Sequence, residues 1–184
     1  LDLSAPRGKG IFLDLARICD VVVENYRASV MDRLGLGYDA VSQANPQLIY
    51  VKISSQGDSG PERDYGSLGS TLEQTAGLAS VTGYEGGPPL MTNETYPDPV
   101  VGILAFGALM AALRRRRATG RGCLVDLSQR EVTSMLLGEV FLDYSANGRV
   151  AGTMGNRHRD MSPHGVYPCL GDDMWAAISV NAED

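Results

Sequence analysis

Three short, largely apolar runs, separated from one another by helical segments, constrain the fold of this chain more than any other feature. The runs lie at residues 21–23, 48–53 and 123–127, and the first consists of three valines. Short, largely apolar runs of this kind are typical of parallel strands buried on both faces. Because helical spacing precedes or separates these runs, the sequence predicts an α/β fold with an open parallel sheet and flanking helices.

Helix signals support this order. Ser4 and Pro6 suit a helix start, and Ile11, Phe12, Leu15 and Ile18 follow helical spacing. Further helices are expected at 30–34, 38–44 and 98–118. Ser70 with Glu73 and Ser128 with Glu131 have the spacing of capping boxes, which predicts helices to about 80 and to 147.

The composition excludes several classes of protein. The chain has 184 residues with a net charge of −6, which is long enough for a substantial core and disfavours a dedicated nucleic-acid-binding protein. Cys19, Cys123 and Cys169 show no CxxC spacing, so neither a disulfide framework nor a metal site is expected. The longest apolar stretch, 100–113, is too short for a membrane span and no signal peptide is visible, which predicts a cytoplasmic protein without membrane contact.

The last part of the chain differs from the rest in composition and periodicity. Residues 149–163 are polar with little periodicity, and a hairpin is expected at 166–170 and 175–180. We therefore expect residues 1–148 to belong to a large domain, 149–163 to be a linker, and 164–184 to begin a smaller α+β domain. The chain starts with Leu1 rather than Met, so we expect it to be a piece of a longer protein.

Asp98 precedes Pro99 and a long helical segment. This is a common helix start, with Asp98 as the N-cap and Pro99 as the first helical residue. The free N–H groups and dipole of a helix start also favour an ionised carboxylate. Two Gly-rich loops, 55–69 and 83–97, would allow a substrate to approach closely. Asp98 therefore has two compatible interpretations: a structural cap, and a poised nucleophile or base.

A polar cluster follows the first predicted strand: Glu24, Asn25, Tyr26 and Arg27, with Arg33 further on. In open α/β sheets, ligands bind beyond the carboxyl ends of the strands. Tyr26 offers a flat face for a base, and the two arginines offer forked donors for phosphate. The alternative is that these residues are solvated and form ordinary ion pairs.

Other features favour structural roles. The basic run 114–117 lies in the last turns of a helix, where cations offset the dipole. His158 and His164 lack metal-ligand spacing, and Trp175 is most simply a core or interface residue. The sequence contains no GxGxxG, Walker or GxSxG motif.

An ordered set of segments runs over nearly the whole chain. They are LDLSAPRG at 1–8, DVVVENYR at 20–27, RLGLGY at 33–38, NPQLIY at 45–50, LASVTG at 78–83, GPP at 87–89 and TGRG at 119–122. In this order they resemble the family III CoA-transferases, also called the CaiB/BaiF family. The resemblance implies a large Rossmann-like domain, a smaller domain joined by long linkers, and two chains interlocked in a homodimer.

The resemblance also implies an enzyme that moves CoA between carboxylic acids. Acyl-CoA and a carboxylic acid would be its substrates, and no cofactor would be permanently bound. The family's catalytic aspartate corresponds to Asp98, which would form an acyl–aspartyl anhydride and then an aspartyl–CoA thioester. Its CoA contacts correspond to Asn25, Tyr26 and Arg33, with Arg27 as a further candidate. The fragment alone is expected to be inactive.

Two alternatives stay open. The family includes α-methylacyl-CoA racemases, which pair the aspartate with a histidine from a preceding loop, but this sequence has no histidine before His158. This favours transfer over racemisation. The other alternative is an inert CoA-binding or dimerisation module in which Asp98 only caps a helix.

Overall fold

Residues 1–181 are described by the computed structural model. The elements of its first half are α1 (Pro6–Ile18), β1 (Val21–Glu24), α2 (Val30–Arg33), α3 (Tyr38–Ala44), β2 (Ile49–Ser54), α4 (Gly69–Thr75) and α5 (Leu78–Val81). Those of its second half are α6 (Pro97–Thr119), β3 (Cys123–Ser128), α7 (Gln129–Met135), α8 (Gly138–Asn147), β4 (Met161–Pro168) and β5 (Trp175–Asn181).

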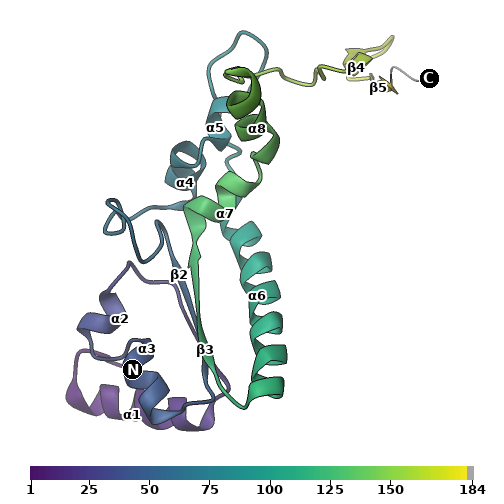
Figure 1. Ribbon diagram of the computed structural model, residues 1–184. Coiled ribbons are helices and arrows are strands. Elements are labelled where there is room, and N and C mark those ends of the chain that lie inside the picture. Colours follow the sequence, from purple (N-terminus) through teal and green to yellow (C-terminus); the bar gives the residue numbers. More distant parts are fainter. Residues whose placement is uncertain (182–184) are drawn as a thin grey trace.

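The first three strands form one sheet in the order β1-β2-β3, and both pairings are parallel. The predicted α/β fold with a parallel sheet is confirmed. Every residue of the central strand β2 is buried, which explains why its sequence is apolar apart from Lys52 and Ser54. Helix α6 runs along one face of the sheet, and α1 and α3 lie on the other (Figure 1).

Alternate residues of β2 face two separate apolar clusters, because side chains of a strand point to opposite faces in turn. Ile49, Val51 and Ile53 pack with Val101, Ala105 and Ala112 of α6. On the opposite face, Tyr50 and Leu48 pack with Ala16 of α1 and Val41 of α3. Full burial of a Val or Ile side chain contributes about 1.5–3 kcal/mol, so these clusters hold both layers on the sheet.

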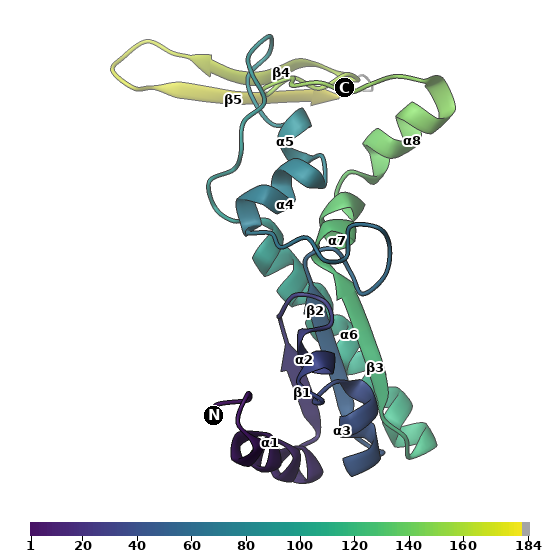
Figure 2. The same ribbon diagram turned by 90° about the vertical axis from the view of Figure 1, so that its left-hand side faces the viewer.

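Helix α6 ends at Gly120, whose φ of 69° is the left-handed conformation that terminates many helices. By length and composition alone α6 would qualify as a membrane span, a test that core helices also pass. In this fold its apolar face contacts β2 and β3, and the helix extends beyond the carboxyl ends of the strands (Figure 2).

Strands β4 and β5 form a separate antiparallel hairpin. The hairpin was expected, but β4 begins at Met161, within the stretch predicted as a linker. Both views place the hairpin beyond α8 and away from the three-stranded sheet (Figures 1 and 2). The division into a large domain, a linker and a small domain stays a prediction.

Three helix predictions are wrong in detail. Ala5 rather than Ser4 precedes α1, and Ile11, Leu15 and Ile18 are exposed, because α1 packs through Phe12, Leu13 and Ala16. The helix expected from Ser70 to about 80 is two helices, and so is the one expected to 147. A left-handed Gly77 separates α4 from α5, and Leu136 and Leu137 separate α7 from α8.

Candidate active site

A pocket of about 660 Å³ opens beyond the carboxyl ends of β1, β2 and β3. Its wall comes from five parts of the chain: the loop after β1, the loop between β2 and α4, helix α4 itself, the start of α6 and the start of α7. The lining residues are Asn25, Tyr26, Arg27, Ser55, Gly66, Ser67, Leu68, Gly69, Thr71, Leu72, Asp98 and Gln129. This is where ligands bind in open α/β sheets.

The pocket brings Asp98 together with three of the four predicted CoA-binding residues. Asn25, Tyr26 and Arg27 share its wall with Asp98. Arg33 does not line it: this residue ends α2 and its side chain is exposed to solvent. The CoA-binding prediction for Arg33 therefore has no support from the pocket geometry.

Asp98 lies in the first turn of α6, and the prediction that it is the N-cap before Pro99 is wrong. The helix begins two residues before the predicted first helical residue, at Pro97, which suits that position as well as Pro99 does. Over the described residues no side-chain hydrogen bond caps α6. The Asp98 carboxylate is exposed at the pocket and accepts a hydrogen bond from Gln129 Nε2 at 3.3 Å.

Gln129 was missed by the sequence reasoning. It is buried (7% exposed) at the start of α7, directly after β3. The Ser128 hydroxyl accepts the N–H of Glu131 at 3.2 Å, so this half of the predicted capping box is confirmed. Gln129 could have been found from the sequence, because polar residues just beyond the carboxyl end of β3 are candidates for ligand contact in the same way as those beyond β1.

Glu73 fixes the loop that precedes Asp98. It was expected to cap a helix with Ser70, but its buried carboxylate instead accepts the N–H of Thr92 at 2.7 Å and the Thr92 hydroxyl at 2.6 Å. Gly69 packs against the end of the same loop: a Cβ there would lie 2.7 Å from Thr95 Cβ and 3.1 Å from Asp98 Oδ2. These contacts leave little room for the start of α6 to move.

The loop after β1 is held by Glu24. Its buried carboxylate accepts the N–H of Tyr26 at 2.8 Å. Burial raises the pKa of Glu24, and the hydrogen bond from Tyr26 opposes this shift. Tyr26 is half exposed, and the Arg27 guanidinium lies against Gly66, where a Cβ would meet Arg27 Nε at 2.5 Å. The pocket thus presents an aromatic face and a cation on the wall that includes Asp98.

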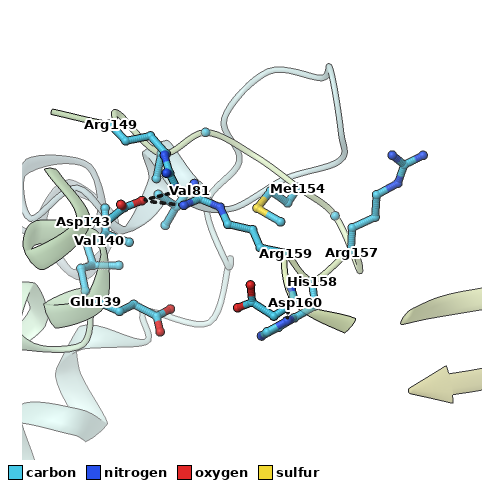
Figure 3. Close-up of a pocket in the computed structure, with 14 residues that line it drawn as sticks. Val81, Glu139, Val140, Asp143, Arg149, Met154, Arg157, His158, Arg159 and Asp160 are labelled. Atoms are coloured by element: carbon cyan, nitrogen blue, oxygen red, sulfur yellow. Dashed lines mark hydrogen bonds and ion pairs between the residues drawn. The ribbon is translucent and has the colours of Figure 1, made fainter. Parts of the chain in front are cut away.

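A second pocket, of about 490 Å³, lies at α8 and the segment that follows it (Figure 3). Its charged groups are largely paired. Asp143 contacts Arg159 at 2.5 Å and Arg149 at 3.4 Å, and Arg157 pairs with Glu85 at 2.9 Å. His158 lines this second pocket. Among the residues that the structure describes, neither His158 nor His164 lines the Asp98 pocket.

Two arginines of the basic run at the end of α6, a run predicted to be a solvated helix end, form contacts with neighbouring turns. Arg116 pairs with Asp20 at 2.8 Å, and Arg115 donates to the Gly122 carbonyl at 3.1 Å. These contacts tie the helix end to the turns below the sheet, opposite the pocket.

Comparison with known proteins identifies the family of this chain. A family model described as CoA-transferase family III matches residues 1–184. The chain is 34% identical to acetyl-CoA:oxalate CoA-transferase of Acetobacter aceti, over 94% of this chain and 47% of that protein. It is 32% identical to succinate–glutarate CoA-transferase of Agrobacterium fabrum, over 91% of this chain and 42% of that protein.

The fold has solved counterparts. A CAIB/BAIF family protein from Brucella suis superposes with a TM-score of 0.86 at 27% identity, over 95% of this chain and 46% of that structure. The chain spans about half the length of the curated relatives it matches. From its sequence and its fold, the chain belongs to CoA-transferase family III.

Proposed function

We propose that the full-length protein transfers CoA between carboxylic acids, with Asp98 as the nucleophile. The observation that carries the proposal is the meeting of an exposed carboxylate with Asn25, Tyr26 and Arg27 in one pocket. A CoA nucleotide has a flat base and several phosphates, which suit an aromatic face and a guanidinium.

The first half-reaction loads CoA onto the enzyme. A carboxylate oxygen of Asp98 attacks the thioester carbonyl of the donor, which forms an acyl–aspartyl anhydride and releases the CoA thiolate. The thiolate attacks the aspartyl carbonyl, so that the donor acid leaves as a carboxylate and an aspartyl–CoA thioester remains. Such covalent steps divide one difficult exchange into easier ones.

The second half-reaction reverses these steps with the acceptor. The acceptor carboxylate attacks the aspartyl thioester and again releases the thiolate. The thiolate then attacks the acceptor carbonyl, which yields the new acyl-CoA and restores the Asp98 carboxylate. Each step exchanges one oxyanion or thiolate for another, so no external acid, base or metal is required.

Gln129 supports the nucleophile in this scheme. Its amide donates to Asp98 Oδ1 and leaves Oδ2 for attack. This hydrogen bond fixes the orientation of the Asp98 carboxylate at the pocket.

The names of the relatives suggest the first substrates to test. Acetyl-CoA and succinyl-CoA would serve as donors, with oxalate, succinate and glutarate as acceptors. The full-length parent should convert at least one pair. Asp98→Asn should lower kcat/KM by at least about 10³-fold, because the nucleophile is lost.

Asp39→Asn is the matched control. Asp39 is exposed and occupies the second position of α3, as Asp98 does in α6. Each substitution should cost at most about 1 kcal/mol of stability through the helix dipole. If Asp98 were only a structural residue, the two variants would retain equal activity, and the proposal would be wrong.

The racemase alternative predicts deuterium exchange at the α-carbon of a 2-methylacyl-CoA without CoA transfer. The inert-module alternative predicts CoA binding without turnover. We also expect a homodimer, since a second copy would cover exposed apolar side chains such as Phe106, Leu142 and Trp175. A monomeric mass of the full-length protein by light scattering would contradict this.

A further inference from the structure

A buried lysine lies beneath the Asp98 pocket, in a row of charged side chains that crosses the sheet. Glu24, Lys52 and Asp126 are register partners on β1, β2 and β3. Register partners on adjacent strands are about 4.8 Å apart, and their side chains point to the same face. Lys52 is only 5% exposed, so its ammonium needs charged partners.

The two partners of Lys52 lie in helix α2 and in the loop between β2 and α4. Its Nζ lies 2.6 Å from Asp58 Oδ1 and 3.2 Å from Asp32 Oδ2. Burial by itself would lower the pKa of Lys52, but the hydrogen bonds to Asp58 and Asp32 outweigh it and raise that pKa. The lysine is therefore a fixed cation that bridges two carboxylates.

The two carboxylates belong to the segments that form the pocket walls. Asp58 is in the loop between β2 and α4, which contributes Ser55 and residues 66–68 to the pocket. Asp32 is in α2, which directly follows the loop of Asn25, Tyr26 and Arg27. The same walls meet above, where Arg27 lies against Gly66.

We propose that Lys52 is a positioning residue for CoA, which clamps α2 to the β2–α4 loop and so sets the distance between the two walls of the pocket. Lys52 itself does not line the pocket and acts through Asp32 and Asp58. The inference rests on the proposed function for its ligand. Its effect should fall on CoA binding rather than on the chemical step at Asp98, which is held separately by Glu73 and Gln129.

The test measures CoA affinity by calorimetry, and KM and kcat for acyl-CoA, in the full-length protein. Lys52→Met and Asp58→Asn should each raise the Kd for CoA and the KM by roughly five- to tenfold, with kcat within about threefold of the parent. The Asp58→Asn variant is expected to fold even if Lys52→Met does not, because Asp58 is partly exposed and Lys52 keeps its pairing with Asp32. Asp64→Asn is the control: Asp64 is an exposed residue of the same loop and pairs only loosely with Arg63, at 3.8 Å.

The double variant separates a clamp from two independent effects. If the two single substitutions break the same contact, the double variant Lys52→Met/Asp58→Asn should raise the Kd for CoA little more than Lys52→Met alone does. An unchanged Kd in folded Asp58→Asn, additive effects in the double variant, or an equal effect of Asp64→Asn would overturn the inference. A parent that binds CoA without transferring it would overturn only the proposed reaction, whereas a parent that does not bind CoA would overturn both.

Discussion

Gly69 is the position at which one added methyl group should most directly displace Asp98, the proposed nucleophile. It is the first residue of α4, and its φ is not positive, so alanine can adopt the backbone conformation. A Cβ there would lie 2.7 Å from Thr95 Cβ and 3.1 Å from Asp98 Oδ2. Carbon atoms pack at about 3.5–4.0 Å, so the segment from Thr95 to Asp98 would have to shift by about 0.8 Å or more.

A displacement of this size has separate consequences for stability and for rate. Overpacking costs about 1–3 kcal/mol of unfolding free energy. Misplacing a reacting group by about 1 Å costs on the order of 10²-fold in rate. Gly69→Ala should therefore lower kcat by roughly 10²-fold while the Kd for CoA changes little, because Tyr26 and Arg27 stay in place.

The assay compares kcat, CoA affinity and urea unfolding of the full-length parent, Gly69→Ala and Gly10→Ala. Gly10 is the control, since it lies inside α1 and a Cβ added there would meet nothing within 4 Å. Alanine at this position should stabilise the protein by about 0.5–1 kcal/mol. Parental kcat in Gly69→Ala would refute the reasoning that the α4–α6 contact sets the position of Asp98.

Three further predictions concern the surroundings of the pocket. Gln129→Met keeps the side-chain length but removes the donor to Asp98, so kcat should fall about tenfold with KM unchanged, and an unchanged kcat would remove Gln129 from the scheme. Ser128→Ala removes the acceptor for the Glu131 N–H and should cost about 1 kcal/mol in urea unfolding. Burial raises the pKa of Glu24 above its ordinary value of 4.5, so the folded state favours the neutral acid. The stability that Glu24 contributes is therefore fully present below about pH 4.5 and is lost as the pH rises through the raised pKa. Glu24→Gln should therefore gain stability relative to the parent between about pH 4 and pH 7, and urea unfolding at both pH values checks the sign.

The parallel sheet could be predicted because its signal is local. A run such as that of β2 is apolar at nearly every position because both faces are covered, and this pattern survives without knowledge of the partners. The location of the pocket followed from the same reasoning, since strand ends gather at one edge of a parallel sheet.

The contacts made by individual polar residues could not be predicted in the same way. Ser70 and Glu73 have the spacing of a capping box, but Glu73 reaches Thr92, a residue 19 positions away in a loop without regular structure. Pro97 and Pro99 both suit the start of a helix, and the choice between them depends on packing. Lys52 interrupts an apolar strand, and its carboxylate partners are known only once the fold brings α2 and the β2–α4 loop next to β2.

The central claim is that Asp98 carries CoA covalently during transfer. The most direct test incubates the full-length protein with acyl-CoA in the absence of acceptor, followed by rapid acid quenching, proteolysis and mass measurement of the peptide that contains Asp98. The account predicts a peptide heavier by the mass of CoA less one water, which borohydride reduces or hydroxylamine releases. An unmodified Asp98 peptide in a preparation that actively transfers CoA, or CoA attached to another residue, would contradict it.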